Sequence, residues 1–176
     1  MSEATPPLAA RQNGHAVAEP GKYLTFKLGH ESYGIPVLKV REIIRLCPIT
    51  LVANMPAHVK GVINLRGKVI PLVDLRTKFG LPVTLDNERT CIVVTQIASA
   101  SGGARLYGII VDGVEEVAHF TDADLEPTPD FGGAIDAQFI TGMAKASAGV
   151  KMLVDLDRIW AADCAALPDP RPPQPE

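Results

Sequence analysis

Aromatic residues are scarce in this chain of 176 residues, at 5%, whereas hydrophobic residues make up 47%. The chain can therefore bury a sizeable core, but that core must be largely aliphatic. Charge of neither sign dominates, since the formal net charge is −3. The sequence thus lacks both the basic surplus and the base-stacking aromatic residues that are typical of nucleic-acid-binding proteins, and it has no general attraction to anionic lipid.

Long apolar runs and paired cysteines are also missing. No segment approaches the ~20 consecutive apolar residues of a membrane-spanning helix, and the N-terminal residues show no secretory signal pattern. The three cysteines, Cys47, Cys91 and Cys164, are odd in number and far apart. This usage favours free thiols in a reducing compartment. We therefore expect a cytoplasmic protein in which Cys47 and Cys91 are small buried hydrophobic residues.

Catalytic and metal-binding motifs are absent as well. The four histidines are scattered, and there is no His-Glu-x-x-His, Cys-x-x-Cys, phosphate loop or Gly-x-Ser-x-Gly elbow. The acidic run Asp122, Asp124, Glu126 lacks the glycine that a calcium loop needs at its bend. We therefore expect no enzymatic activity, no cofactor and no metal. A small hydrolase with a site assembled from distant residues is an alternative that pocket geometry would have to support.

Segments without an apolar period flank the patterned part of the chain. Residues 1–21 and the proline-rich residues 166–176 predict disordered ends. Between them, short apolar runs separated by turn residues predict about ten strands in two clusters. This pattern indicates a mainly β fold of two small antiparallel barrels.

A helical period occurs near the C-terminal end. Leu156, Ile159 and Trp160 recur at helical spacing, with Asp155 as a suitable N-cap and Pro168 ending the run. The pattern predicts a short amphipathic helix that docks on the barrels, with Trp160 in the core.

The most informative stretch is residues 61–75. Two apolar runs, Val62–Leu65 and Val69–Leu75, flank Arg66-Gly67-Lys68 and predict a hairpin in which Gly67 supplies the positive φ of the turn. Both runs are apolar on both faces, so we expect the hairpin to lie between two packed layers. Arg66 would be held on a stiff support, where little side-chain freedom is lost on binding.

Several short motifs follow one another in a defined order between residues 22 and 165. They are Tyr33-Gly34-Ile35 followed by Val40-Arg41-Glu42-Ile43; Gly61-Val62-Ile63-Asn64-Leu65-Arg66-Gly67 followed by Pro71-Leu72-Val73-Asp74-Leu75; Gly108-Ile109-Ile110-Val111-Asp112-Gly113-Val114; and Leu153-Val154-Asp155-Leu156. In this order and spacing they resemble the CheW family of chemotaxis coupling proteins. No phosphotransfer, ATP-binding or receiver segment accompanies them, so the chain resembles the stand-alone adaptor rather than the kinase with a homologous module.

The resemblance implies a fold and a function. The fold is two intertwined SH3-like five-stranded β-barrels with a short C-terminal helix, within a domain at 22–165. The barrels correspond approximately to the first and second halves of this domain, with exchange of strands between them left open. The function is a non-enzymatic scaffold in signal transduction that couples methyl-accepting chemoreceptors to the histidine kinase CheA, in the cytoplasm and at membrane-associated receptor arrays. The implied partners are the chemoreceptor cytoplasmic helical hairpin and the CheA regulatory domain. Further coupling-protein copies in array rings are another candidate. Binding to nucleic acid and insertion into the membrane are not expected.

Receptor binding in the family uses a groove between the barrels. By motif match, that groove involves seven residues here: Val40, Glu42, Gly61, Arg66, Gly67, Gly108 and Val114. The glycines would let a partner helix approach the backbone, the valines would offer apolar contact, and the charged pair would add polar specificity. All seven also fit roles without a partner, in turns, in the core or in a surface ion pair. The kinase-binding residues are not identified by this match.

Two other functions stay open at this point. The same adaptor could serve a non-flagellar receptor–kinase pathway, which only the receptor would reveal. A β-barrel nucleic-acid-binding module is disfavoured by the acidic net charge and the few aromatic residues. The roles of the glycine-rich turn at 98–103 and of the proline-rich tail are not predicted.

Overall fold

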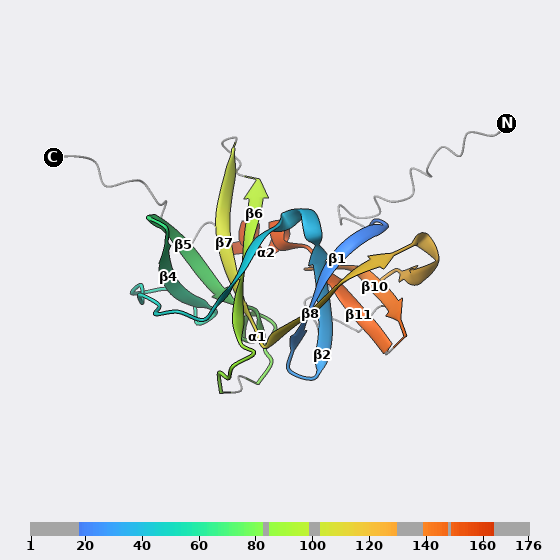
Figure 1. Cartoon of the computed structure of the whole chain (residues 1–176), viewed down its shortest axis with the longest axis horizontal. Helices are drawn as coiled ribbons and strands as arrows, with labels where there is room; N and C mark the ends of the chain where they lie inside the picture. The colour runs from blue at the N-terminus through green and yellow to red at the C-terminus, as the bar shows by residue number, and fades with distance from the viewer. Residues whose placement is uncertain (1–17, 83–84, 99–102, 130–138, 148, 164–176) are drawn as a thin grey trace.

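Two β-sheets lie side by side and give the molecule two lobes (Figure 1). The structure is a computed structural model that describes residues 18–82, 85–98, 103–129, 139–147 and 149–163. The predicted disordered ends, the tip of the 98–103 turn and Cys164 therefore lie mostly or wholly outside the described residues.

The first sheet has six strands in the order β8-β1-β2-β11-β10-β9. Their bounds are β1 Gly21–Leu28, β2 Glu31–Pro36, β8 Gly113–Phe120, β9 Leu125–Glu126, β10 Ile140–Ala146 and β11 Gly149–Val154. All pairs are antiparallel except β2 with β11, which join the start of the chain to its end.

The second sheet has five strands in the order β3-β6-β7-β5-β4. Their bounds are β3 Val40–Arg45, β4 Val59–Leu65, β5 Lys68–Asp74, β6 Cys91–Ala98 and β7 Ala104–Val111. Here β5 and β7 are the parallel pair. The chain thus begins in the first sheet, crosses to the second through the 3-10 turn η2 (Val37–Lys39), and returns at β8. The two sheets are therefore intertwined.

Both sheets curl back on themselves. The edge strands β8 and β9 of the first sheet are joined by residues 121–124 alone, which include the 3-10 turn η3 (Asp122–Asp124). So short a link can span at most about 17 Å, so the end of β8 and the start of β9 must lie within that distance of each other. In the second sheet an ion pair between Glu42 and Arg66 joins the edge strand β3 to the β4–β5 hairpin. The predicted two-barrel fold is confirmed, with barrels whose edge strands are not paired to each other in the described residues.

The central strands of the second sheet bury both of their faces. On one face Ile70 and Leu72 of β5 pack inside the barrel with Ile92 of β6. On the other face Val73 and Val93 join a larger cluster between the two sheets. Alternate side chains of one strand point to opposite faces, so an all-apolar strand serves two cores at once. This arrangement agrees with the burial expected for the 61–75 hairpin on both sides, at least from Ile70 onward.

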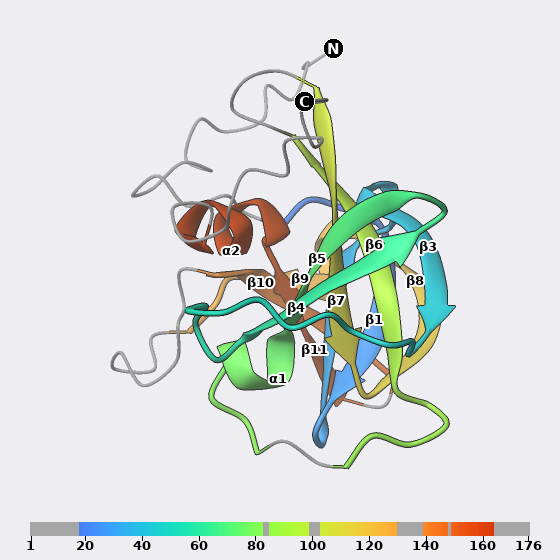
Figure 2. The ribbon, with the colours of Figure 1, turned by 90° about the vertical axis from the view of Figure 1, so that its left-hand side faces the viewer.

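Two short helices complete the fold, and both lie on the side of the molecule opposite β3 and β8 (Figure 2). They are α1 (Leu75–Lys78) and α2 (Leu156–Asp163). Trp160 of α2 is 1% exposed and stacks on Tyr107, with ring centroids 4.0 Å apart. Asp155 Oδ1 accepts a hydrogen bond from the Arg158 backbone, as expected of an N-cap. The helix and the core position of Trp160 match the sequence prediction, and the predicted end at Pro168 lies outside the described residues.

The two described cysteines differ from the prediction. Cys47 and Cys91 are both free thiols, but each is half-buried rather than fully buried. Cys91 is the first residue of β6, where the strand leaves the core, and this position explains its partial exposure. Burial still raises the pKa of the Cys91 thiol above its usual value, because desolvation disfavours the thiolate.

Candidate functional site

The turn of the β4–β5 hairpin consists of Arg66 and Gly67, both with positive φ, at 50° and 83°. Two such residues in succession match a type I′ turn, whose twist suits the flanking strands. The Asn64 side chain accepts a hydrogen bond from the Gly67 backbone at 2.9 Å and holds the turn. The positive φ predicted for Gly67 is therefore present, and Arg66, a residue that rarely adopts this conformation, shares it.

Arg66 forms an ion pair with Glu42 of β3. The Arg66 side chain is 70% exposed and that of Glu42 is 32% exposed. A pair this accessible contributes about 0–1 kcal/mol to folding. Its main effect is to hold a guanidinium and a carboxylate side by side at the surface, where both groups remain accessible to a binding partner.

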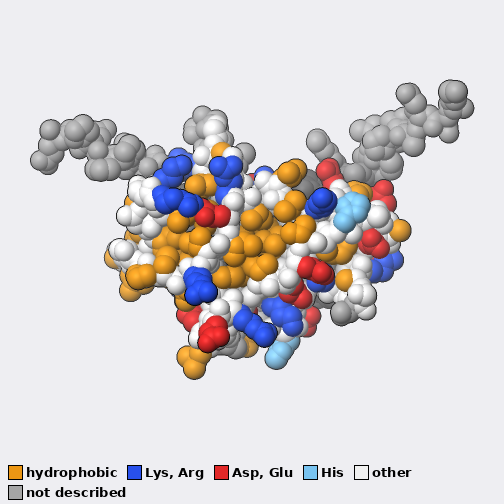
Figure 3. Space-filling model, in the orientation of Figure 1, with side chains coloured by type: hydrophobic (Ala, Val, Ile, Leu, Met, Phe, Trp, Pro, Cys, Tyr) orange, Lys and Arg blue, Asp and Glu red, His pale blue; other side chains and the backbone are white. Residues whose placement is uncertain are grey.

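Val40 and Val114 lie at the seam between the two sheets. Both are partly buried and pack against the core cluster between the sheets, Val40 at the start of β3 and Val114 on β8. The neighbouring Ile43 and Val117 on the same two strands are 46% and 53% exposed. Figure 3 shows apolar side chains gathered across the middle of the face that is turned to the viewer. In the same view, Figure 1 shows β8 and the cyan strand β3 there. We call Val40, Ile43, Val114 and Val117 the central apolar face.

Gly61 and Gly108 are buried behind this surface. A Cβ atom on Gly108 would overlap Leu72 Cδ2 and lie 2.9 Å from Ile92 Cγ2. A Cβ atom on Gly61, which has a φ of 136°, would overlap the backbone oxygen of Thr50. Both glycines are thus required by the packing of the second barrel itself. Of the seven predicted residues, the structure pairs Glu42 with Arg66, sets Val40 and Val114 on one core cluster, and turns Gly61 and Gly108 inward.

Sequence reasoning missed a buried charge cluster around Arg76 of α1. Its side chain is 3% exposed and binds Asp74 through Nε and Nη2 at 3.0 and 2.9 Å. Nη1 donates to Asp112 at 2.9 Å, and Nη2 also lies 3.2 Å from Asp86. The hydrogen bonds to Asp74 raise the pKa of Arg76 beyond its already high value. The sequence feature that could have indicated this cluster is Asp74-Leu75-Arg76 at the end of an apolar strand. There a helix N-cap carboxylate is followed two residues later by a cation.

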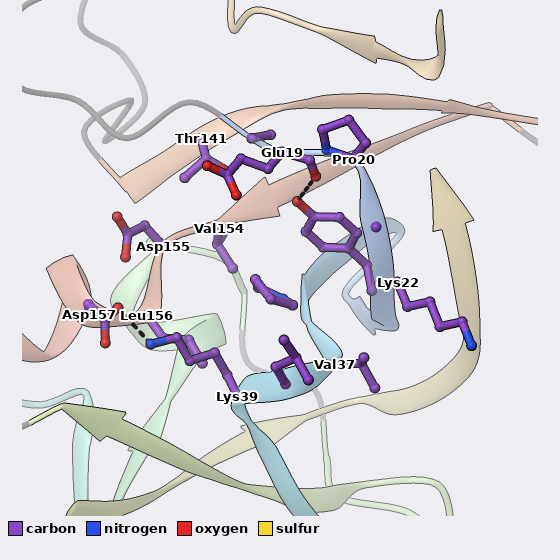
Figure 4. A pocket seen from close by; sticks show the side chains of 15 residues that line it. Glu19, Pro20, Lys22, Val37, Lys39, Thr141, Val154, Asp155, Leu156 and Asp157 are labelled. Carbon is purple, nitrogen blue, oxygen red and sulfur yellow. Dashed lines mark hydrogen bonds and ion pairs between the residues drawn. The ribbon is translucent and has the colours of Figure 1, made fainter. Parts of the chain in front are cut away.

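A hollow of about 580 Å³ lies elsewhere, between η2, the start of β1 and the start of α2 (Figure 4). Tyr23 and Leu38 contribute apolar wall, and Lys39 Nζ donates to Asp157 Oδ2 at 3.0 Å on its rim. Its lining includes no histidine, cysteine or serine. The hollow contains none of the seven predicted residues.

Neither a membrane helix nor a metal site emerges from the part of the chain that the structure describes. No helix there is long and apolar enough to cross a bilayer. No three histidine, cysteine or acidic side chains there are grouped so as to hold a metal ion.

The comparisons with known proteins agree on one family. A family model described as a CheW-like domain matches residues 22–163. The chain belongs to the CheW-like family. It is 36% identical over 148 residues to the chemotaxis protein CheW of Klebsiella aerogenes, covering 84% of this chain and 86% of the relative. It is 32% identical over 140 residues to the chemotaxis protein CheW of Rhizobium meliloti, covering 80% and 87%.

The fold of this CheW-like protein is also found in a solved structure. The crystal structure of the scaffolding protein TtCheW from Thermoanaerobacter tengcongensis superposes with a TM-score of 0.72 at 31% sequence identity. The match covers 80% of this chain and 92% of the scaffolding protein. Family, chemotaxis relatives and scaffold structure therefore all agree with the resemblance read from the motifs.

Proposed function

We propose that this chain is a non-enzymatic chemotaxis scaffold that couples methyl-accepting chemoreceptors to the histidine kinase CheA. The observation that carries the proposal is the CheW-like match across residues 22–163, nearly the whole patterned part of the chain. We assign the function to a domain at 22–165 and assign no role to the flanking ends. The protein would work in the cytoplasm and be recruited to receptor arrays at the membrane.

The receptor site we propose centres on the central apolar face and the Glu42–Arg66 pair. A helix of the receptor's cytoplasmic hairpin would lay its apolar side on Val40 and Val114, since helix-in-groove recognition relies on apolar anchors of this kind. No helix of the described chain covers this face, because α1 and α2 lie on the opposite side (Figure 2). Glu42 and Arg66 would give polar specificity at its edge.

The proposed roles of the three glycines differ from one another. Gly67 lets the hairpin turn hold Arg66 in place, and apart from its two chain neighbours no other residue lies within 4 Å of where its Cβ would be. Gly61 and Gly108 act indirectly, because they allow the barrel behind the site to pack. We therefore expect substitutions at Gly61 and Gly108 to affect binding through the fold, and those at Arg66 to affect binding directly.

Charge reversal of Arg66 tests the site. We expect Arg66→Glu to remain folded, because the ion pair is exposed, but to bind a chemoreceptor hairpin fragment about thirtyfold more weakly, the loss of a ~2 kcal/mol contact. Two carboxylates would then face each other at the edge of the receptor helix. The measurement is a calorimetric titration of the fragment, with circular dichroism to check the fold.

A matched control is available in the first sheet. Lys145 of β10 forms an exposed ion pair with Glu126 of β9 at 3.2 Å, outside the proposed site. Lys145→Glu makes the same change in net charge and breaks the same kind of pair, so it should keep wild-type affinity. Equal affinities for Arg66→Glu and the wild type, both folded, would overturn the site assignment. Equal losses in both variants would indicate a general charge effect instead.

A further inference from the structure

Asp112 is the single residue between β7 of the second sheet and β8 of the first. Its carboxylate is shared between the two sheets. Oδ1 accepts a hydrogen bond from Arg76 Nη1 at 2.9 Å, and Oδ2 accepts one from the Gly29 backbone at 2.6 Å. Gly29 belongs to the β1–β2 turn of the first sheet, whereas Arg76 follows β5 of the second. One side chain thus ties the start of β8 to both lobes.

A backbone hydrogen bond strengthens the junction between the two sheets at Asp112. The Asp112 N–H donates to the carbonyl oxygen of Lys27 at 3.0 Å, so main chain and side chain of Asp112 both hold the β1–β2 hairpin. On the other side, Arg76 is fixed by the fully buried Asp74, which accepts from its backbone N–H and from its guanidinium. A guanidinium held by a bidentate carboxylate in a buried site has little freedom to move.

The junction lies two residues from Val114 of the central apolar face. Val114 belongs to β8 and the first sheet, whereas Val40, its counterpart on that face, belongs to β3 and the second. The relative position of these two side chains therefore depends on how β8 leaves the second sheet. No other residue intervenes between β7 and β8 to absorb a change there.

We propose that Arg76 and Asp112 are positioning residues that set the place of β8 against β3 and so the shape of the receptor-binding surface. This inference rests on the proposed function of that surface. Neither residue belongs to the seven predicted for receptor binding, and both are largely buried, with side chains 3% and 15% exposed. They act through Val114 rather than on the receptor.

Two carboxylates on the same guanidinium provide a matched test. Asp112→Asn leaves one carbonyl oxygen where two oxygens accepted, so either Arg76 or Gly29 loses its acceptor and meets an N–H instead. Asp86→Asn also removes one carboxylate from Arg76, but Asp86 is 52% exposed and lies between α1 and β6, on the side of the second sheet in sequence. If Arg76 served stability alone, both variants would change binding only as far as they unfold the protein.

The first readout is affinity for a chemoreceptor hairpin fragment at a temperature where all variants are fully folded. We expect Asp112→Asn to bind about tenfold more weakly and Asp86→Asn to bind as the wild type does, since remote positions of this kind change binding by about 0.5–2 kcal/mol. The second readout needs no receptor: amide hydrogen exchange measured by NMR on the full chain. We expect Asp112→Asn to lower protection selectively in β8 and the β1–β2 turn, and not in β6.

The outcomes separate the two proposals. Wild-type affinity in Asp112→Asn, or a uniform loss of protection across both sheets, would overturn the positioning role while leaving the proposed function intact. A wild-type protein that does not bind the fragment would overturn the proposed receptor site. In that case the exchange pattern would still decide whether Asp112 positions β8.

Discussion

Gly108 gives the most discriminating prediction, because the sequence and the structure suggest different reasons for the same glycine. The motif match places it in a groove that a partner helix approaches. The structure shows it buried in β7, with its missing Cβ directed at Leu72 Cδ2 and Ile92 Cγ2. Gly108→Ala should therefore lower the stability of the protein first and its receptor affinity only as a consequence.

The magnitude follows from the contacts. Leu72 and Ile92 are both fully buried, so neither can move aside into solvent. Forcing one methyl group into such a core costs about 1–3 kcal/mol. For a domain of this size that corresponds to a fall in Tm of roughly 3–10 °C. The assay is urea denaturation followed by circular dichroism, with the midpoint compared at constant m-value.

A second substitution tests the cause. Leu72→Val removes the δ carbons that the new methyl group would meet, so Gly108→Ala should cost less in that background than in the wild type. The resulting double-mutant cycle should give a coupling of about 1 kcal/mol, as expected for residues in direct contact. A stability of Gly108→Ala within ~0.3 kcal/mol of the wild type would refute the reasoning. Strict additivity in the cycle would refute the assigned contact.

Two further predictions concern the core and the thiol. Trp160→Ala should cost about 3–5 kcal/mol, since the indole is buried and stacked on Tyr107; a loss below ~1 kcal/mol in urea denaturation would show that α2 is not part of the core. Burial raises the pKa of Cys91, so its contribution to stability is complete below the usual thiol pKa and is lost as the pH rises through the raised value. Alkylation of Cys91 by iodoacetamide, followed by mass spectrometry, should therefore reach half its maximal rate at a higher pH than a peptide thiol of pKa ~8.5, and a midpoint at or below that value would contradict the assignment.

Much of the fold could be predicted from the sequence because its local signals agree. The Arg66-Gly67 turn, the apolar runs around it and the Asp155 cap each describe a few neighbouring residues, and each is present in the structure. The pairing of distant strands is different. The parallel pairs β2 with β11 and β5 with β7 join strands that are far apart along the chain, and no local pattern encodes which strand lies beside which.

The candidate site could be predicted only in part, for the same reason. Arg66 and Glu42 are separated by 24 residues. The sequence predicts their ion pair only as an alternative to receptor binding. The exposure of Ile43 and Val117 depends on which strands lie at the edges of their sheets. The burial of Arg76 depends on Asp112 and Asp86, which reach it from other elements. The motif match to the family supplied the candidate residues, and tertiary packing decides which of them share a surface.

The central claim, that this chain couples receptor to kinase, is tested most directly by reconstitution. Receptor-containing membranes and purified CheA are mixed with and without the protein, and CheA autophosphorylation is measured. The account predicts that the wild type and Lys145→Glu raise kinase activity well above that of receptor and kinase alone, whereas Arg66→Glu does not. Kinase activity that is unchanged by the folded wild-type protein would contradict the account.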